Sequence, residues 1–371
     1  MANRGKSYDP NVHSIADLKR LGSGKLAKTY REYYNEGAMN LITLRSNTTA
    51  YDRYLIRPRV LRDVSNPDTS TSIFGCKVKF PFGFSPTAMQ ALAHPEGEVA
   101  TSKAAAKSGI LMGLSCYSTI DLERVVERGT GNPYAMQISL LQNKDAIVQL
   151  VKRAEASGFK ALFVTLDALY LGRRLKEYRN SFAMAKGMDY ENLYPGMDVS
   201  NLEDAGDSMA YDMAMEWPEL VSFFRPHTSI QIWGKGIYTA ADAELAIKYG
   251  LDGIVISNHG GRQLDSVPSS LDVLREVVPV ANGKIPIAID GRMRRGTDIL
   301  KALALGADFC LAGRPAIWGL AYNSQAGVEL AINLLYDEFR TCMALAGCKN
   351  ISEISKDHIS LLQQDGRLLK L

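Results

Sequence analysis

The chain has 371 residues, of which 46% are hydrophobic and 22% charged, and this composition excludes a disordered or fibrous protein. Forty-three Lys and Arg residues against forty Asp and Glu leave a net charge of +3, far below the basic excess of a dedicated nucleic-acid-binding protein. No apolar run approaches the about 18 residues that a membrane helix needs, and the N-terminus lacks the apolar core of a signal peptide. We therefore expect a protein that binds neither nucleic acid nor membranes.

The cysteines and histidines exclude two further classes of protein. Five cysteines, at positions 76, 116, 310, 342 and 348, include no C-x-x-C pair, which favours a reducing, cytoplasmic compartment. The five histidines form no H-x-x-x-H and no cysteine pair completes a zinc set, so we expect no metal site. The final Leu-Lys-Leu shares only Lys-Leu with the S-K-L peroxisomal address, so a peroxisomal location stays open as the alternative.

Residues 1–75 predict a helical preface, for example over Lys28 to Ala38, and eight short apolar runs follow it. Four of these runs come directly after a helical stretch that ends on Gly, which is typical of strands buried on both faces of a parallel sheet. Helical patterns lie between the runs, such as the apolar stripe of Ile147, Leu150, Val151 and Ala154. The eight predicted strands lie near 82, at 108–115, near 133, at 157–165, near 229, at 249–257, near 284 and at 305–313.

Eight such units within about 240 residues predict an α/β fold of the (β/α)₈ barrel type. A doubly wound open sheet is the alternative, but it would usually carry a G-x-G-x-x-G turn after an early strand, and none is present. We expect one domain over 1–371, with the barrel at about 80–322 and helices over 323–371. The long polar connection at 168–216 is expected on the carboxyl face of the barrel, where it could form a lid.

Polar residues follow almost every predicted strand and would meet at that face. Caps of the next helix would explain many of the Ser, Thr and Asp side chains, but not Lys235, His259 or the clustered arginines. In Ser257 to Asp265 an imidazole and a guanidinium, which can move a proton and bind a carboxylate, flank two glycines. The residues concerned are Ser85, Thr87, Ser115, Gln137, Ser139, Thr165, Asp167, Lys235, Ser257, His259, Asp290, Gly313 and Arg314.

Two Gly- and Arg-rich turns predict a phosphate site after the last two strands. They are Ala288 to Asp298 and Leu311 to Pro315, and phosphate sites after strands seven and eight recur in these barrels. A basic surface patch for nucleic acid is the alternative for Arg292, Arg294 and Arg295, but no aromatic residues are interleaved with them.

In its motifs the chain resembles the FMN-dependent α-hydroxy-acid oxidases and dehydrogenases, the group of glycolate oxidase and lactate oxidase. The resemblance runs from about Ala27 to the end of the chain and implies a barrel that holds FMN at its carboxyl face. It is carried, in the expected order and spacing, by PTAMQ (86–90), HPEG (94–97), LGRR (171–174), SNHGGRQLD (257–265), RRGTD (294–298), KALALGAD (301–308) and GRP (313–315).

For the cofactor, the resemblance implies four groups of contacts. Backbone of Pro86, Thr87 and Ala88 would run beside the flavin ring, and Ser115, Gln137 and Thr165 would bond its polar edge. Lys235 would face the N1 and C2 edge, where a cation stabilises the negative charge of reduction, and Ser257 would lie near the ribityl chain. The ribityl and phosphate groups would be held by Asp290, Gly291, Arg292, Arg294, Gly313 and Arg314.

For the substrate, the resemblance implies that Arg262 and Tyr33 bind the carboxylate and that Arg174 is a second basic contact. His259 would be the base beside the hydroxyl-bearing carbon, with Asp167 stabilising the imidazolium that forms. The family also implies a homo-oligomer, often a tetramer.

Three departures from the family pattern matter, at 139, at 117 together with 141, and at 292. Ser139 stands where the family has Tyr, Leu141 replaces a further aromatic residue, and Tyr117 is shared with lactate oxidases where glycolate oxidases carry Trp. Because aromatic bulk is lost at 139 and 141, we predict that the substrate pocket lined by Ser139 and Tyr117 is roomier than glycolate needs. The alternative is that water or a lid residue, such as Tyr190, Tyr194 or Tyr211, fills the space. Arg292 replaces a Gly in the usual D-G-G-x-R turn, which leaves the geometry of the phosphate loop open.

The predicted function is oxidation of an (S)-2-hydroxy acid to a 2-keto acid, with the electrons passed to O₂ to give H₂O₂. Two alternatives stay open. One is the same half-reaction with a different electron acceptor, as in a dehydrogenase. The other is a barrel that binds FMN or another phosphate ligand without oxidising a substrate. Against it argues the joint presence of Tyr33, Asp167, Arg174, His259 and Arg262.

Overall fold

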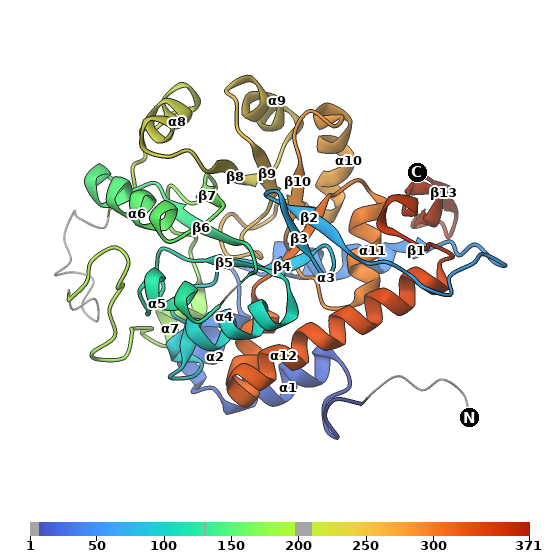
Figure 1. The fold of residues 1–371 in the computed structure, drawn as a ribbon, viewed down its shortest axis with the longest axis horizontal. Coiled ribbons are helices and arrows are strands. Elements are labelled where there is room, and N and C mark those ends of the chain that lie inside the picture. Colours follow the sequence, from blue (N-terminus) through green and yellow to red (C-terminus); the bar gives the residue numbers. More distant parts are fainter. Residues whose placement is uncertain (1–6, 130, 197–209) are drawn as a thin grey trace.

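The computed structural model describes residues 7–129, 131–196 and 210–371, and its centre is a closed barrel of eight parallel strands (Figure 1). The barrel closes where Leu311 pairs with Gly83, between the last strand and the first. All eight predicted strands and the barrel are confirmed. The strands are β4 (Phe82–Phe84), β5 (Leu111–Leu114), β6 (Tyr134–Ser139), β7 (Ala161–Thr165), β8 (Gln231–Ile237), β9 (Gly253–Ile256), β10 (Ile287–Ile289) and β11 (Phe309–Ala312).

Helices surround the barrel, as the periodic segments between the strands predicted (Figure 1). The predicted stripe of α6, Ile147, Leu150, Val151 and Ala154, is fully buried. The Thr239 side chain accepts a hydrogen bond from the backbone N–H of Asp242 and caps the amino end of α9. The helices are α4 (Gly97–Ser108), α5 (Leu122–Glu127), α6 (Lys144–Ala156), α8 (Trp217–Phe224), α9 (Ala240–Lys248), α10 (Ser270–Ala281), α11 (Gly296–Ala304) and α12 (Arg314–Leu345).

A hairpin closes the amino end of the barrel. Strands β2 (Thr71–Ile73) and β3 (Cys76–Val78) present Phe74, whose ring meets Trp233 edge to face with centroids 5.2 Å apart. Ile73 and Val78 belong to the same buried cluster as Phe163 and Trp233 inside the barrel. Since this end is plugged by apolar side chains, the barrel's polar chemistry is confined to its carboxyl end.

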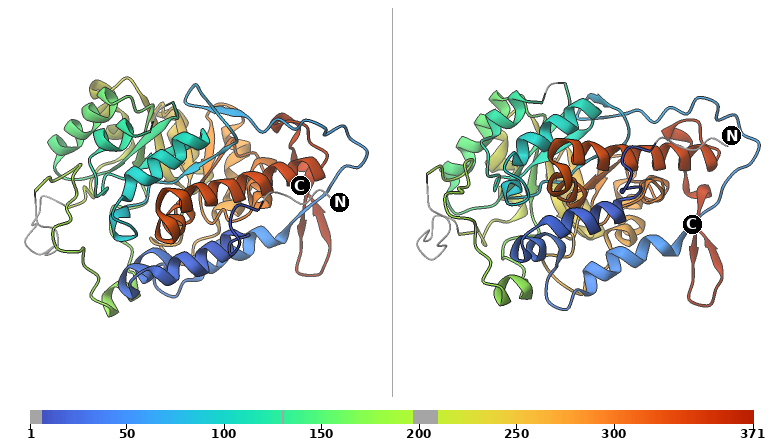
Figure 2. Two further views of the ribbon diagram at one scale, coloured as in Figure 1. Left: turned by 60° about the horizontal axis from the view of Figure 1, so that its bottom comes forward. Right: turned by 90° about the horizontal axis from the view of Figure 1, so that it is seen from below.

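The preface and the tail are only partly helical. Helices α1 (Ile15–Lys25), α2 (Lys28–Asn35) and α3 (Ile42–Arg53) precede β1 (Tyr54–Ile56), and α1 packs along α12 (Figure 2). The prediction of helices throughout 323–371 is wrong: α12 ends at Leu345, and the chain finishes in β12 (Ile359–Leu362) and β13 (Leu368–Lys370). Strand β12 pairs with β1, and the hairpin projects from the body in Figure 2. Its partner lies some three hundred residues earlier, so no local pattern could indicate the pairing.

The long connection between β7 and α8 contains the short helix α7 (Leu175–Arg179). Part of this predicted loop, 197–209, lies outside the described residues. Beyond that gap, Tyr211 forms an antiparallel bridge with Leu141, just after β6. Among the described residues, none of the helices combines the length and the apolarity needed to span a membrane.

Candidate active site

A cavity of about 490 Å³ opens at the carboxyl ends of the barrel strands, with walls from α2 and the long connection. Apart from Asp167 and Ser257, every side chain or backbone predicted from the sequence to contact cofactor or substrate lines it. These residues are Tyr33, Pro86, Thr87, Ala88, Ser115, Tyr117, Gln137, Ser139, Thr165, Arg174, Lys235, His259, Arg262, Asp290, Gly291, Arg292, Arg294, Gly313 and Arg314.

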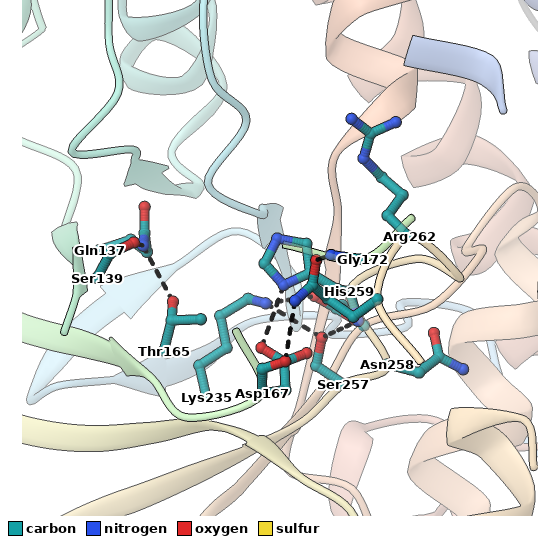
Figure 3. Close-up of polar contacts among 12 residues, drawn as sticks. Gln137, Ser139, Thr165, Asp167, Gly172, Lys235, Ser257, Asn258, His259 and Arg262 are labelled. Carbon is teal, nitrogen blue, oxygen red and sulfur yellow. Dashed lines mark hydrogen bonds and ion pairs between the residues drawn. The ribbon is translucent and has the colours of Figure 1, made fainter. Parts of the chain in front are cut away.

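The two remaining predicted residues lie directly behind this wall and orient those that line it. Nδ1 of His259 lies 3.1 Å from Oδ1 of Asp167, and the Ser257 hydroxyl accepts a hydrogen bond from the His259 backbone N–H at 3.1 Å (Figure 3). Because the carboxylate accepts the Nδ1 proton, Nε2 is the nitrogen left with a lone pair. His259, Gly260 and Gly261 all have positive φ, so this tight turn aims the imidazole.

Burial and charge set the protonation state of this pair. Burial lowers the pKa of His259, and the opposing attraction of Asp167 does not overcome it. Burial acts to raise the pKa of Asp167, but the charges of His259 and Lys235 outweigh it and leave the pKa of the carboxyl lowered. At neutral pH the pair is therefore a neutral imidazole beside a carboxylate, which is the state a general base requires.

Lys235 links the His259 turn to the next strands. Its Nζ donates to the Ser257 hydroxyl at 3.1 Å and lies 3.8 Å from Oδ2 of Asp290. Both charged side chains are buried, and the other oxygen of Asp290, Oδ1, has no hydrogen-bond partner among the described residues. A buried carboxylate oxygen without a donor indicates that a ligand hydroxyl or N–H belongs beside it.

Gln137 organises the ends of β5, β6 and β7. Its Nε2 donates to the hydroxyls of Thr165 at 3.0 Å and Ser139 at 3.1 Å, while Oε1 accepts from the Ser115 hydroxyl at 3.1 Å. Figure 3 shows Gln137, Ser139 and Thr165 grouped on one side of the Asp167–His259 pair. This chain of polar groups is suited to the heteroatom edge of a planar ring.

Positive charge collects at the other end of the cavity. Arg314 donates to three backbone carbonyls, those of Tyr34, Glu36 and Gly260, at 2.7, 3.0 and 3.1 Å. Burial, together with the charges of Arg262 and Arg292, lowers the pKa of Arg314 to about 9. Burial and the charges of Arg314 and Arg292 likewise lower the pKa of Arg294. Cations that repel each other in a buried wall indicate an anionic ligand, and a phosphate fits.

Arg292, the departure in the phosphate turn, has φ of +76°, directly after Gly291 at +105°. The left-handed region costs a non-glycine residue about 1–2 kcal/mol, which explains why glycine is usual here. The chain therefore keeps the backbone shape of a D-G-G-x-R turn with an arginine in it, and the Arg292 side chain lines the cavity. Arg295 instead pairs with Asp52 and Asp298 and does not line the cavity.

The predicted carboxylate-binding arginines share one partner that the sequence analysis missed. Glu177 lies 3.3 Å from Nη2 of Arg262 and 3.6 Å from Nη1 of Arg174. Figure 3 shows the Arg262 side chain extending away from the Asp167–His259 pair, and its Nη1 donates to the Tyr33 carbonyl. The ring of Tyr33 stacks on Phe182 at 4.4 Å, which was also missed. Only the spacing of Arg174 and Glu177, three residues apart, could have indicated the ion pair.

Aromatic side chains form the wall near Ser139. The rings of Tyr117 and Tyr190 meet edge to face with centroids 5.1 Å apart, and the Tyr117 hydroxyl donates to that of Tyr211 at 3.4 Å. Tyr190 and Tyr211 line the cavity, whereas Tyr194 is buried outside its lining. Tyr190 and Tyr211 thus lie in the same cavity wall as Ser139, and the prediction of a roomier pocket stays a prediction.

The cavity therefore offers a ring edge at Gln137, a buried cation at Lys235, a donor-seeking oxygen on Asp290 and a cationic end at Arg292, Arg294 and Arg314. In a flavin mononucleotide, the ring would fit beside Gln137 and Lys235, the polyol beside Asp290, and the phosphate beside the arginines. A family model described as FMN-dependent dehydrogenase matches residues 23–361. The chain belongs to this family. FMN is accordingly its cofactor.

Individual proteins that are similar to this chain support the same assignment. The chain is 48% identical to "Oxidase FUB9" of Fusarium oxysporum f. sp. lycopersici over 98% of this chain and 95% of the relative. It is 41% identical to the glycolate oxidase of Spinacia oleracea over 94% of this chain and 96% of the relative. A crystal structure of mandelate oxidase superposes with a TM-score of 0.84 at 35% identity, covering 92% of this chain and 97% of that one.

Proposed function

We propose that this protein oxidises an (S)-2-hydroxy acid to the 2-keto acid and passes the two electrons to O₂, giving H₂O₂. The observation that carries the proposal is the His259–Asp167 pair, 3.1 Å apart, whose imidazole lines the same cavity as Arg174 and Arg262. A barrel that only binds a phosphate ligand has no use for a base paired with a carboxylate. The relatives named above are oxidases, which favours O₂ over another acceptor.

In the proposed reaction His259 removes the proton of the substrate hydroxyl, and Asp167 stabilises the imidazolium that forms. Arg262, Arg174 and Tyr33 hold the substrate carboxylate, so that the hydroxyl-bearing carbon faces the base. When the acid binds, its carboxylate would either displace Glu177 from the two arginines or bind them beside Glu177. The carbon also loses its hydrogen, so two electrons and two protons leave the acid in all. FMN, when bound, would supply the acceptor for the two electrons, and the two protons end in H₂O₂.

The residues assigned to FMN follow the geometry of the cavity. Pro86, Thr87 and Ala88 would lie along the ring, and Ser115, Gln137, Thr165 and Lys235 at its polar edge. The ribityl and phosphate groups would be held by Ser257, Asp290, Gly291, Arg292, Arg294, Gly313 and Arg314.

We propose that the favoured substrates carry an apolar side chain. Leu171, Phe182, Tyr190 and Tyr211 give the substrate end of the cavity walls that are largely apolar. A longer side chain would gain about 0.8 kcal/mol for each methylene that it buries there, and glycolate would gain nothing.

Anaerobic mixing with a panel of acids tests the proposal. The yellow FMN enzyme should be bleached by (S)-2-hydroxy acids, most efficiently by 2-hydroxyoctanoate and mandelate and least by glycolate. One H₂O₂ per acid should follow when air is admitted. No bleaching by any acid would favour a non-oxidising barrel, bleaching without peroxide would favour a dehydrogenase, and a maximum at glycolate would refute the proposed side-chain preference.

Assembly as a homo-oligomer, with a tetramer expected from the family, is part of the proposal. Size-exclusion chromatography with light scattering tests it, and a monomer would contradict it.

A further inference from the structure

The Ser139 hydroxyl belongs to a buried polar network that also includes the Tyr117 hydroxyl. The Ser139 oxygen accepts a hydrogen bond from Nε2 of Gln137 at 3.1 Å and a weaker one from the Cys116 thiol at 3.6 Å. The side chain is also short, and the residue is buried at the end of β6. Where the resemblance implies a tyrosine that contacts the substrate, this chain therefore has a residue committed to the Gln137 network.

A segment of the long connection brings another phenol to the same place. The backbone N–H of Gln142 donates to Ala210, and that of Asp212 donates to Leu140, both at 2.9 Å. Tyr211 thereby faces Leu141 in an antiparallel bridge, two residues beyond Ser139. An ion pair between Asp212 and Lys144 anchors the segment to the start of α6. The two backbone hydrogen bonds of the bridge and the ion pair fix the backbone of Tyr211.

The hydrogen-bond direction leaves the Tyr211 proton available. The Tyr117 hydroxyl is the donor toward the Tyr211 oxygen, at 3.4 Å. Within the described ranges, no hydrogen bond uses the proton of Tyr211 itself. The Tyr211 side chain lines the cavity together with Arg174. Burial raises the pKa of Tyr211, so the phenol keeps its proton over the working pH range.

We propose that Tyr211 is the substrate-binding phenol of this enzyme: its hydroxyl, oriented by Tyr117, donates a hydrogen bond to an oxygen of the bound acid in place of the tyrosine that the family carries at position 139. The inference rests on the proposed function, because it names a contact to the proposed substrate. In this chain the hydrogen-bond donor would therefore come from the connection after β7, whereas the resemblance implies a donor from β6.

The test removes only the hydroxyl. In the FMN-loaded enzyme, Tyr211→Phe should weaken binding of the 2-keto acid benzoylformate about 10-fold to 100-fold, measured without turnover from the shift in flavin absorbance. Anaerobic reduction by mandelate should slow by a similar factor. Tyr178→Phe makes the same change in the same connection, where the ring is 68% exposed, and should alter neither quantity.

A relocation experiment separates a substrate contact from a packing role. The double variant Ser139→Tyr with Tyr211→Ser moves the phenol back to the position implied by the family, and should recover at least half of the binding lost in Tyr211→Ser. Tyr211→Phe with unchanged benzoylformate binding would overturn the inference, as would a double variant no better than Tyr211→Ser. If no 2-hydroxy acid reduces the wild-type enzyme, the proposed function fails, and the binding measurement still decides whether Tyr211 holds a keto acid.

Discussion

The Asp167→Asn variant offers a sharp test of the proposed base. The carboxylate accepts the Nδ1 proton of His259 at 3.1 Å, and the substitution keeps the shape of the side chain while removing its charge. Two unit charges about 4 Å apart interact by about 4 kcal/mol at the effective dielectric of about 20 that suits such sites. Since this attraction exists only when His259 is protonated, its loss should slow flavin reduction by about 10²–10³-fold.

The same variant should move the pH profile in a defined direction. Burial lowers the pKa of His259, and Asp167 partly opposes that shift by favouring the imidazolium. In wild type, the neutral base is therefore lost only as the pH falls through a value below the ordinary His pKa of about 6.5. Without the carboxylate the pKa of His259 falls further, so the acid limb should move to lower pH while the plateau drops.

Anaerobic stopped-flow measurement of flavin reduction between pH 4.5 and pH 8, at saturating substrate, gives both quantities. Asp308→Asn is the matched control, because its carboxylate accepts the Ile287 backbone N–H at 2.8 Å beside the base of β10, away from the cavity lining. That variant should keep the wild-type rate and profile. An Asp167→Asn plateau within threefold of wild type, or an acid limb shifted to higher pH, would refute the reasoning.

Three further substitutions test separate parts of the site. His259→Asn should retain FMN and slow flavin reduction by at least about 10²-fold, measured by stopped flow, and a normal rate would end the proposed mechanism. Arg262→Met should keep FMN but weaken benzoylformate binding by about 10–100-fold in a spectral titration, because a charge-assisted contact is lost; unchanged affinity would remove Arg262 from the carboxylate site. Arg292→Gly should raise the stability of the FMN-free protein by up to about 1 kcal/mol, because φ of +76° is relieved, and should weaken FMN binding severalfold. Thermal unfolding without FMN and fluorescence titration with it measure the two effects, and FMN affinity equal to wild type would show that Arg292 does not contact the phosphate.

Much of this site could be predicted from the sequence, because in a barrel of parallel strands the residues near the carboxyl ends of all the strands meet at one face. Each strand was visible from its apolar run, four of them also from a preceding glycine, and parallel strands bring their carboxyl ends to one face. Gln137 and Lys235 lie toward the carboxyl ends of β6 and β8, and His259 follows β9, yet the three line one cavity. Residues named only from strand ends and motifs were therefore brought together without any knowledge of long-range contacts.

The tertiary structure decided what depends on partners far apart in the chain. The tail forms β12 because β1 offers it a free edge, and Glu177 meets Arg262 because the long connection folds across the β9 loop. Tyr211 reaches the cavity through backbone bonds to residues 140–142, in a segment whose own sequence carries no strand period. Whether a segment forms a strand or a helix depends largely on the pattern of its neighbouring residues. Long-range pairings depend instead on which strand edges and side chains remain exposed once the barrel has folded.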